Sequence, residues 1–189
     1  TTVANAIFNR IGSENISYIC HDYYYKDLSN LSKEEISKVN FDHPNSLDTH
    51  LLIDDIIKLS HGNEIQCPIY DFTTHSRLKD THRTVKANKI ILIEGILVFH
   101  EKKLRDLMNI KIFVDTEADE RLMRRINRDR TQRGRKISDI LDQYKTTVKP
   151  MHQQFIEPSK IYSDVIIPSG YNSAAVDLVV SCLLKKIKI

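Results

Sequence analysis

The sequence predicts an α/β fold with a mainly parallel sheet and helices on both faces. Short apolar runs alternate along the chain with segments in which apolar residues recur at helical spacing. The run Ile90–Ile93 is apolar at every position, which is typical of a strand buried on both faces of a parallel sheet. The 189 residues contain no internal repeat, low-complexity tract or interdomain linker. We therefore expect a single domain over residues 1–189.

The expected elements follow the chain in order. Apolar runs predict strands at Ile16–Cys20, Ile90–Ile93, Ile110–Val114 and Asp164–Ile167. Apolar residues three or four positions apart predict helices over 3–11, 51–59, around 122–126, 137–144 and 174–184. Gly62 lies where the second of these helices should stop.

The segment from Ile65 to Ala87 does not fit the alternation of strands and helices. Its first part, Gln66–Tyr70, and its last part, Arg83–Ala87, have the character of two strands that run out and back. We therefore expect a β-hairpin insert at about residues 65–87.

Composition excludes several classes of protein. The chain is 41% hydrophobic and 28% charged, which is ordinary for a globular domain. No stretch approaches 18 consecutive apolar residues, so we expect no membrane association. The three cysteines, Cys20, Cys67 and Cys182, are isolated and predict reduced thiols in a cytoplasmic protein. The scattered histidines form no metal-binding pattern.

The most unusual feature is a cluster of arginines. Seven arginines lie within the fifteen residues Arg121–Arg135, and with Lys136 and Asp129 this segment has a net charge of +7. The whole chain carries only +3, so the remainder is net negative. Guanidinium groups match phosphate oxygens two at a time, so the cluster predicts a clamp for a small phosphorylated ligand. The helical pattern breaks at Gly134, which predicts a mobile loop there. Three arginines belong to this loop: Arg128, Arg133 and Arg135.

Two alternatives for the cluster stay open. A charge run is usually a solvated helix face, and it can also bind nucleic acid. The break at Gly134 argues against the first alternative. The short patch on an otherwise negative chain argues against the second, because its phosphate footprint is small. We expect no nucleic acid partner.

Three acidic residues follow expected strands: Asp22, Glu94 and Asp115. Ligands of open α/β sheets bind at this edge, beyond the carboxyl ends of the strands. Asp22 could accept a proton from an attacking hydroxyl, or it could cap a helix. Glu94 precedes Gly95 and could lie beside Mg²⁺ and a nucleotide phosphate, or cap the next segment.

Two further segments suggest a pocket for a sugar and a base. Asp42, in Phe41–Pro44, could accept both vicinal hydroxyls of a ribose, or it could form a turn. The segment Pro68–Arg77 mixes aromatic rings with hydrogen-bonding groups, as a pocket for a planar base would. Its alternative is a loop anchored by buried aromatic side chains.

Together these motifs resemble the uridine kinase (uridine–cytidine kinase) family of P-loop nucleoside kinases. The matching segments run in the family's order: Asp22–Lys26, Phe41–Pro44, Pro68–Phe72, His75–Arg77, Ile93–Ile96, Phe113–Thr116, Arg124–Asp129, Arg133–Arg135, Gln143–Tyr144, Val148–Pro150 and Asp164–Pro168. The resemblance implies a P-loop NTPase-like sheet, a hairpin that binds substrate and an arginine lid at about residues 128–138. It also implies Mg²⁺-dependent transfer of phosphate from ATP to the 5′-hydroxyl of uridine or cytidine, giving UMP or CMP.

One feature of that family is not found in the sequence. P-loop kinases hold phosphates with Gly-x-x-x-x-Gly-Lys-Ser/Thr, and Thr1–Ala4 resembles the residues that directly follow its lysine. We therefore expect the natural polypeptide to extend upstream with the first strand and the phosphate loop.

The resemblance implies roles for individual residues. Asp22 is the expected general base, and Arg128 and Arg133 are expected to contact the phosphates of ATP. The expected metal ligands are Thr1, Asp22 and Glu94, and the expected ATP-binding residues are Thr1, Thr2, Arg128 and Arg133. The expected nucleoside-binding residues are Asp42 and Arg135 at the ribose, Tyr70 and His75 at the base edge, and Phe72, Tyr25 and Gln143 in the pocket wall.

The resemblance further implies a homotetramer, feedback inhibition by CTP or UTP, and GTP as a second phosphate donor. Two alternatives remain. A phosphoribulokinase-like or pantothenate kinase-like phosphotransferase is disfavoured by the segment that holds Tyr70 and His75. A non-catalytic nucleotide- or RNA-binding protein is suggested by the missing phosphate loop and the arginine cluster.

Overall fold

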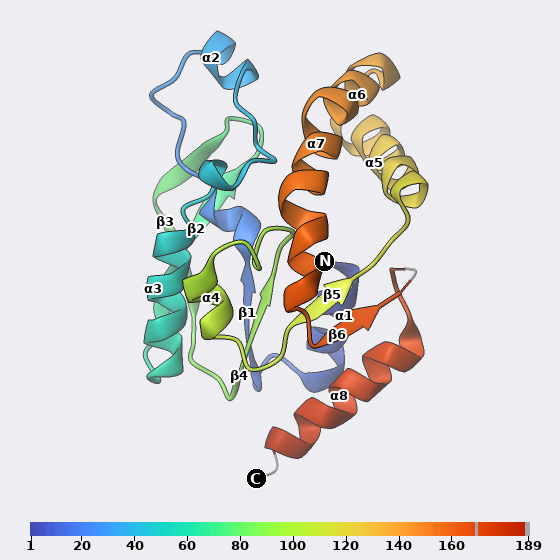
Figure 1. Ribbon diagram of the computed structural model, residues 1–189. Helices are drawn as coiled ribbons and strands as arrows, with labels where there is room; N and C mark the ends of the chain where they lie inside the picture. Colours follow the sequence, from blue (N-terminus) through green and yellow to red (C-terminus); the bar gives the residue numbers. More distant parts are fainter. Residues whose placement is uncertain (169, 188–189) are drawn as a thin grey trace.

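The computed structural model describes residues 1–168 and 170–187 and confirms the α/β organisation (Figure 1). Strands β1 (Ile16–Cys20) and β4 (Ile90–Glu94) pair in parallel, residue for residue. Strands β5 (Ile112–Val114) and β6 (Val165–Ile167) form a second parallel pair. The four predicted strands are therefore present, although β5 and β6 are shorter than expected.

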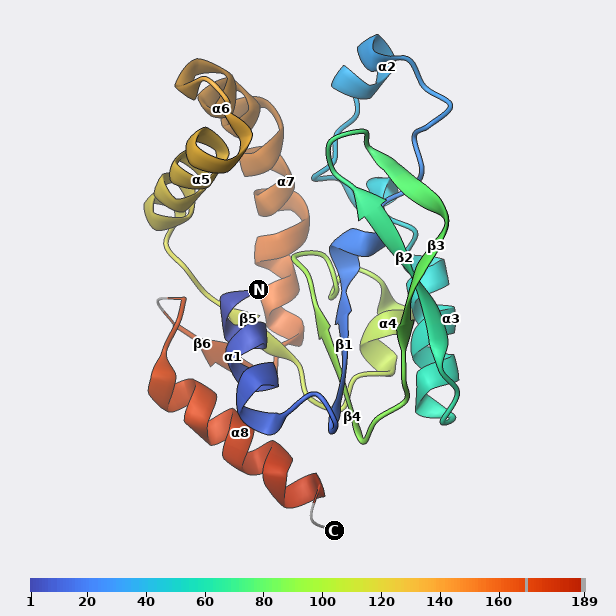
Figure 2. The same ribbon diagram turned by 180° about the vertical axis from the view of Figure 1, so that it is seen from behind.

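Side chains of the central strands alternate between two apolar cores. Ile91 and Ile93 pack toward α3 and α4, whereas Ile90 and Leu92 face the opposite core with α1 and α8. Figure 2 shows α1 and α8 next to each other, to the left of β1 and β4 in that view. Strand β4 is apolar at successive positions because helices cover both of its faces. The four covering helices are α1 (Thr2–Ile11), α3 (Thr49–Ser60), α4 (Lys102–Asp106) and α8 (Ser173–Ile187).

The insert is a β-hairpin, but its return strand lies earlier than predicted. β2 (Ile65–Asp71) pairs antiparallel with β3 (Ser76–Val85), whereas the sequence pattern placed the return strand at residues 83–87. The carboxylate of Asp71 accepts a hydrogen bond of 2.8 Å from the backbone amide of Thr73, which closes a tight turn. β3 therefore begins soon after this turn. Most of β3 is exposed, so it has no apolar pattern that would have identified it.

The arginine-rich segment stays helical for longer than predicted. α5 (Ala118–Arg133) includes both Arg128 and Arg133, so the prediction that these two lie in a loop is wrong. Arginine favours the helical conformation, and the helix ends only where Gly134 adopts a left-handed φ of 62°. Arg135 is the arginine of the three that lies beyond the helix.

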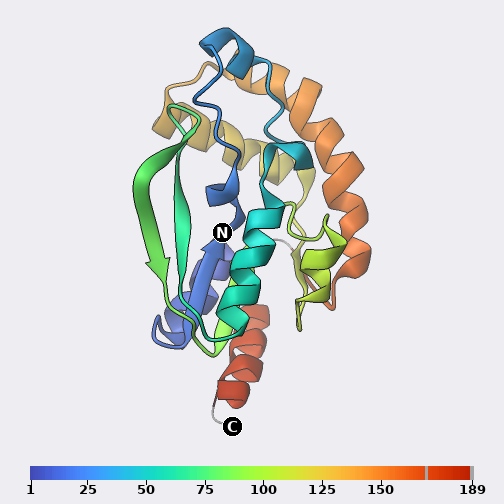
Figure 3. The same cartoon turned by 90° about the vertical axis from the view of Figure 1, so that its left-hand side faces the viewer.

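After Gly134 the chain forms a nearly continuous helical segment. It consists of α6 (Ile137–Gln143), the π-helical η3 (Tyr144–Val148), α7 (Lys149–Met151), the π-helical η4 (His152–Ile156) and the 3₁₀-helical η5 (Glu157–Tyr162). Figure 1 shows α5, α6 and α7 standing on one side of the molecule above β5, with the hairpin and α2 on the other. Figure 3 shows the hairpin and α7 from the side, on opposite flanks of the strands. The two flanks rise beyond the carboxyl ends of β1 and β4.

Short helices complete the side that carries the hairpin. They are η1 (His21–Tyr24), α2 (Lys33–Ser37) and η2 (Pro44–Ser46). None of the helices in the described part of the chain combines the length and apolar character needed to cross a bilayer.

Candidate active site

The carboxyl ends of β1 and β4 open into a cavity of about 2590 Å³. A pocket for one small ligand is on the order of 300–1,000 Å³, and this cavity is larger because it also includes an apolar region lined by β4 and β5. Thr2 begins α1 and does not line the cavity. The other predicted site residues all line it: Thr1, Asp22, Tyr25, Asp42, Tyr70, Phe72, His75, Glu94, Arg128, Arg133, Arg135 and Gln143.

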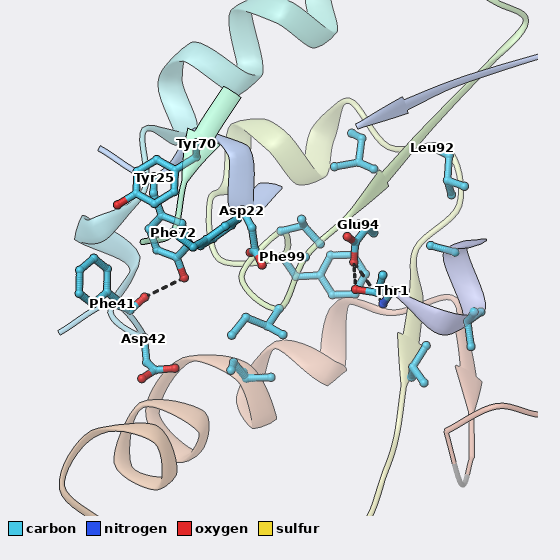
Figure 4. A pocket seen from close by; sticks show the side chains of 18 of the residues that line it. Thr1, Asp22, Tyr25, Phe41, Asp42, Tyr70, Phe72, Leu92, Glu94 and Phe99 are labelled. Carbon is cyan, nitrogen blue, oxygen red and sulfur yellow. Dashed lines mark hydrogen bonds and ion pairs between the residues drawn. The ribbon is translucent and has the colours of Figure 1, made fainter. Parts of the chain in front are cut away.

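Asp22 lies at the centre of the site. It belongs to η1, directly after β1, and Figure 4 shows it between a group of aromatic side chains and the pair Glu94 and Thr1. Burial and the charge of Glu94 raise the pKa of Asp22 to about 6, although nearby arginines oppose this shift. The N-cap of η1 is Cys20, so the helix-capping alternative for Asp22 is wrong. Its carboxylate is mostly ionised at neutral pH and can accept a proton.

Glu94 ends β4 beside Thr1. The hydroxyl of Thr1 donates a hydrogen bond of 3.1 Å to the carboxylate of Glu94, drawn dashed in Figure 4. With Asp22, these residues offer one hydroxyl and two carboxylates. Mg²⁺ prefers oxygen ligands and is usually held by one or two carboxylates together with waters and substrate phosphates. Among the described residues, no group of three or more His, Cys, Asp or Glu side chains offers a richer metal site. The three residues therefore fit Mg²⁺.

An aromatic pocket lies on the other side of Asp22. The ring of Tyr70 lies 5.4 Å from that of Tyr25 and 5.2 Å from that of Phe72, measured between centroids. The hydroxyl of Tyr25 donates to the backbone carbonyl of Phe41 at 3.1 Å. The hydroxyl of Tyr70 is buried and bonds to none of the described residues. A buried hydroxyl without a partner is costly, so Tyr70 is suited to bond a ligand.

His75 completes this pocket from the hairpin turn. Its ring stacks on Phe41 with centroids 4.6 Å apart and an angle of 25° between the planes. Its φ of 52° lies in the left-handed region, which is uncommon outside glycine and often found at functional sites. Burial lowers the pKa of His75, and the charge of Arg133 adds to this effect against that of Asp71. A neutral imidazole presents one donor and one acceptor, which suits the edge of a pyrimidine.

Asp42 lies in the same pocket, and its charge is coupled to that of Arg125. Burial raises the pKa of Asp42, and Arg125 opposes the shift. The backbone amide of Asp42 donates to the side chain of Asn40 at 3.1 Å, so Asn40 makes the turn that was the alternative role for Asp42. The Asp42 carboxylate is thus left for the cavity, where Figure 4 shows it.

The arginines that line the polar end of the cavity come mainly from α5. Arg128 and Arg133 lie close enough to Asp22 for their charges to lower its pKa. Arg125 and Arg135 both donate to the side-chain oxygen of Gln143, at 2.8 and 2.7 Å. Sequence reasoning missed Arg125 as a site residue. The available signal was its helical spacing, because residues three positions apart share a face of a helix and Arg125 precedes Arg128.

Arg77 is a second residue whose role the sequence did not reveal. Its guanidinium donates to the backbone carbonyls of Tyr25 at 2.8 Å and Tyr24 at 3.1 Å, and it pairs with Asp48 at 3.3 Å. These bonds join the hairpin to the segment that follows Asp22. Arg77 therefore fixes the aromatic pocket relative to the central carboxylate.

Asp115 does not share the environment of the other two acids at the strand ends. Its carboxylate pairs with the ammonium group of Lys160 at 2.5 Å, so its charge is neutralised within the protein. Asp22 and Glu94 are thus the acids of this group that face the polar centre of the site.

Replacing Gly95 by alanine should destabilise the protein next to Asp22. A Cβ atom at this position would lie 2.6 Å from the Cβ of His21 and 3.1 Å from a methyl carbon of Val98. His21 is buried directly beside Asp22, so the backbone has little room to move. We expect Gly95→Ala to lower the free energy of unfolding by about 1–3 kcal/mol, as overpacking does. Chemical denaturation measures this directly, and an unchanged midpoint would contradict the close packing.

Comparison with known proteins places the chain in a family. The sequence matches the model of the phosphoribulokinase / uridine kinase family over residues 1–175. A protein named uridine kinase from Chloroflexus aurantiacus is 49% identical over 182 residues, covering 96% of this chain and 87% of that protein. One from Clostridium tetani is 49% identical over 181 residues, covering 95% of this chain and 86% of that protein.

Solved structures show the same fold at low sequence identity. A possible uridine kinase from Bacillus stearothermophilus superposes with a TM-score of 0.55 at 17% identity, covering 88% of this chain and 80% of that chain. Phosphoribulokinase from Rhodobacter spheroides superposes with a TM-score of 0.66 at 15% identity, covering 89% of this chain and 64% of that chain. The fold is therefore that of the P-loop kinases, and the chain belongs to the phosphoribulokinase / uridine kinase family.

Proposed function

We propose that this protein transfers the γ-phosphoryl group of ATP to the 5′-hydroxyl of uridine or cytidine, giving UMP or CMP and ADP. One observation carries the proposal: the partly buried carboxylate of Asp22 lies between an aromatic pocket and a group of side chains suited to bind phosphate. Relatives named uridine kinase, 49% identical to this chain, support the same reaction.

The aromatic pocket holds the nucleoside. The base lies among Tyr25, Tyr70 and Phe72, with the hydroxyl of Tyr70 and the neutral imidazole of His75 bonding its edge. Asp42 accepts both ribose hydroxyls, as one carboxylate can. This orientation directs the 5′-hydroxyl toward Asp22, which lies next along the cavity.

The opposite side of Asp22 holds the triphosphate. Arg128 and Arg133 offer guanidinium donors to the phosphate oxygens, and Thr1, Asp22 and Glu94 would hold Mg²⁺. When bound, Mg²⁺ neutralises charge on the phosphates of the donor. Asp22 takes the proton of the 5′-hydroxyl. The oxygen of that hydroxyl bonds to the γ-phosphorus as the bond between the γ-phosphorus and the oxygen of the departing ADP breaks. Positioning and charge neutralisation supply most of the rate enhancement in such reactions.

In this proposal, two parts of the domain align the nucleoside with the triphosphate. The hairpin, at about residues 65–87, carries the base-binding side chains. The lid, at about residues 128–138, comprises the last turns of α5, Gly134 and the segment with Arg135. Arginines at the end of a helix that stops at a left-handed glycine can close on phosphate charge, which would exclude water from the reaction.

A nucleoside panel tests the function. The full-length protein with ATP and Mg²⁺ should phosphorylate uridine and cytidine and leave adenosine, pantothenate and ribulose 5-phosphate unchanged. The aromatic pocket with Tyr70 and His75 is the reason to expect a nucleobase rather than a sugar phosphate as acceptor. Turnover of ribulose 5-phosphate or pantothenate in place of the nucleosides would assign a different phosphotransferase of the same fold.

Asp42→Ala should discriminate between ribose and deoxyribose. The variant loses two charge-assisted hydrogen bonds to uridine but only one to 2′-deoxyuridine. Because a hydrogen bond to a charged group contributes on the order of 1.5–3 kcal/mol, we expect kcat/KM to fall roughly 10²–10⁴-fold for uridine and roughly 10–10²-fold for 2′-deoxyuridine. Asp54→Ala, at an exposed position of α3, is the control and should leave both values unchanged. Equal losses for the two nucleosides would mean that Asp42 only shapes the pocket.

A further inference from the structure

Asp129 is a charged residue with no solvent exposure in the last turns of α5. A carboxylate is rarely buried in this way unless it is paired, because removing its charge from water is costly. Asp129 has no role among the predicted site residues, and it does not line the cavity. Its burial therefore needs a reason that lies in its partners.

The partners of Asp129 are four arginines, shared between its two oxygens. Arg128 donates to Oδ1 through Nε at 2.9 Å, and a nitrogen of Arg133 lies 3.5 Å from the same oxygen. Arg135 donates to Oδ2 at 3.2 Å, and Arg125 lies 3.9 Å from Oδ2. One buried carboxylate thus lies among the arginines that face the phosphate end of the cavity.

The main chain of Asp129 holds the same segment. Its carbonyl oxygen accepts hydrogen bonds from the amides of Gly134 and Arg135, the latter at 3.1 Å. Its side chain and its backbone therefore both fix the turn that brings Arg135 back against α5. Gln143 accepts hydrogen bonds from both Arg135 and Arg125. The same network therefore includes Arg125, whose charge lowers the pKa of Asp42.

The charges explain why such a centre is needed. The four guanidinium groups and Asp129 sum to +3, and the attraction of each guanidinium to the carboxylate offsets part of the repulsion between these like charges. Burial raises the pKa of Asp129, but the hydrogen bond from Arg128 and the charges of Arg128, Arg133 and Arg125 outweigh this effect, so its pKa lies below the usual value. The side chains of Arg128 and Arg133 remain 46% and 49% exposed, which leaves donors for a second anion.

We propose that Asp129 is a positioning residue for phosphoryl transfer. Its buried carboxylate gathers Arg128, Arg133 and Arg135 into one cluster before ATP arrives, and the outward N–H groups of Arg128 and Arg133 then meet the phosphates together. The inference rests on the proposed function, since the cluster acts on the triphosphate of that reaction. Asp129 itself touches no substrate and acts through the arginines. Pre-organisation of this kind lowers the entropy that must be lost in the transition state.

Asp129→Asn tests the proposal, because it keeps the shape of the side chain and removes its charge. We expect kcat to fall on the order of 10²-fold, as misplaced binding groups cause. Asp119→Asn, an exposed acid at the start of the same helix, should stay within about threefold of the wild type. The unfolding curve of Asp129→Asn must show a folded protein at the assay temperature.

A double-mutant cycle separates positioning from general structural damage. If Asp129 acts through the arginines, Asp129→Asn should cost less than about tenfold in an Arg133→Ala background, because one of the arginines that it positions is already gone. Losses that multiply, or a single variant within threefold of the wild type, would overturn the proposal. A wild type that phosphorylates no nucleoside would instead sink the proposed function.

A measurement on the wild type covers the case in which Asp129→Asn does not fold. The Nε–H of Arg128 bonds to Asp129, so its NMR signal in the ATP-free protein should exchange with water much more slowly than that of Arg124, which is 59% exposed. Equal exchange rates for the two arginines would show that the cluster is not assembled before ATP binds.

Discussion

Asp22→Asn is expected to lower kcat by roughly 10²–10⁴, the usual effect of removing a positioned general base. The amide has nearly the same shape as the carboxylate but cannot take the proton of the 5′-hydroxyl. Burial and the neighbouring Glu94 hold the pKa of Asp22 at about 6, so the wild-type residue is a stronger base than an exposed aspartate and is still mostly ionised at neutral pH. Single-turnover measurement of phosphate transfer reports this step.

Asp115→Asn is the matched control for that variant. Asp115 also follows a parallel strand, β5, and lines the same cavity, but Lys160 neutralises its charge. We expect it to retain kcat within about threefold, because an ion pair that is partly exposed contributes little. Near-normal turnover in Asp22→Asn, or an equal loss in both variants, would remove Asp22 from the role of base.

Arg133→Ala is expected to lower the rate by roughly 10³ or more, because arginines that contact the transferring phosphate stabilise charge that develops in the transition state. Arg133 is the last residue of α5, next to Gly134, and its charge acts to lower the pKa of both Asp22 and His75. Its removal should therefore act mainly on kcat for the reaction with ATP. Steady-state kinetics with each substrate saturating in turn measures the effect.

Arg130→Ala separates a specific contact from a general loss of charge. Arg130 lies in the same helical turn and is exposed, but it does not line the cavity. Removing it changes the net charge by the same amount and should leave kcat nearly unchanged. If both variants altered only the salt dependence of binding, the arginines of α5 would form a solvated helix face instead of a lid.

The strands were predictable because their signal is local. Ile90–Ile93 is apolar at every position and Ile16–Cys20 at every position except Ser17, and the two cores on either side of these strands account for that pattern. The return strand of the hairpin was not predictable in the same way. It is exposed along most of its length, so its position follows from pairing with β2 and from the turn at Asp71, neither of which leaves an apolar trace.

The candidate site shows the same division. The acids Asp22 and Glu94 could be found because they directly follow strands, where the topology of a parallel sheet brings them together. The arginine cluster could be found as a run of charge, but not the arrangement within it. Which guanidinium groups face inward depends on how α5 packs against α6. This packing brings Arg125 into hydrogen-bond contact with Gln143 of α6 and buries Asp129.

In the proposed reaction, Asp22 accepts the proton of the 5′-hydroxyl of a nucleoside held in the aromatic pocket. The most direct test is to incubate the full-length protein with ATP labelled at the γ-phosphate, Mg²⁺ and either uridine or 5′-deoxyuridine, and to identify the labelled product. We expect labelled 5′-UMP from uridine and no labelled nucleotide from 5′-deoxyuridine. Label on another hydroxyl, or no phosphorylated uridine at all, would contradict it.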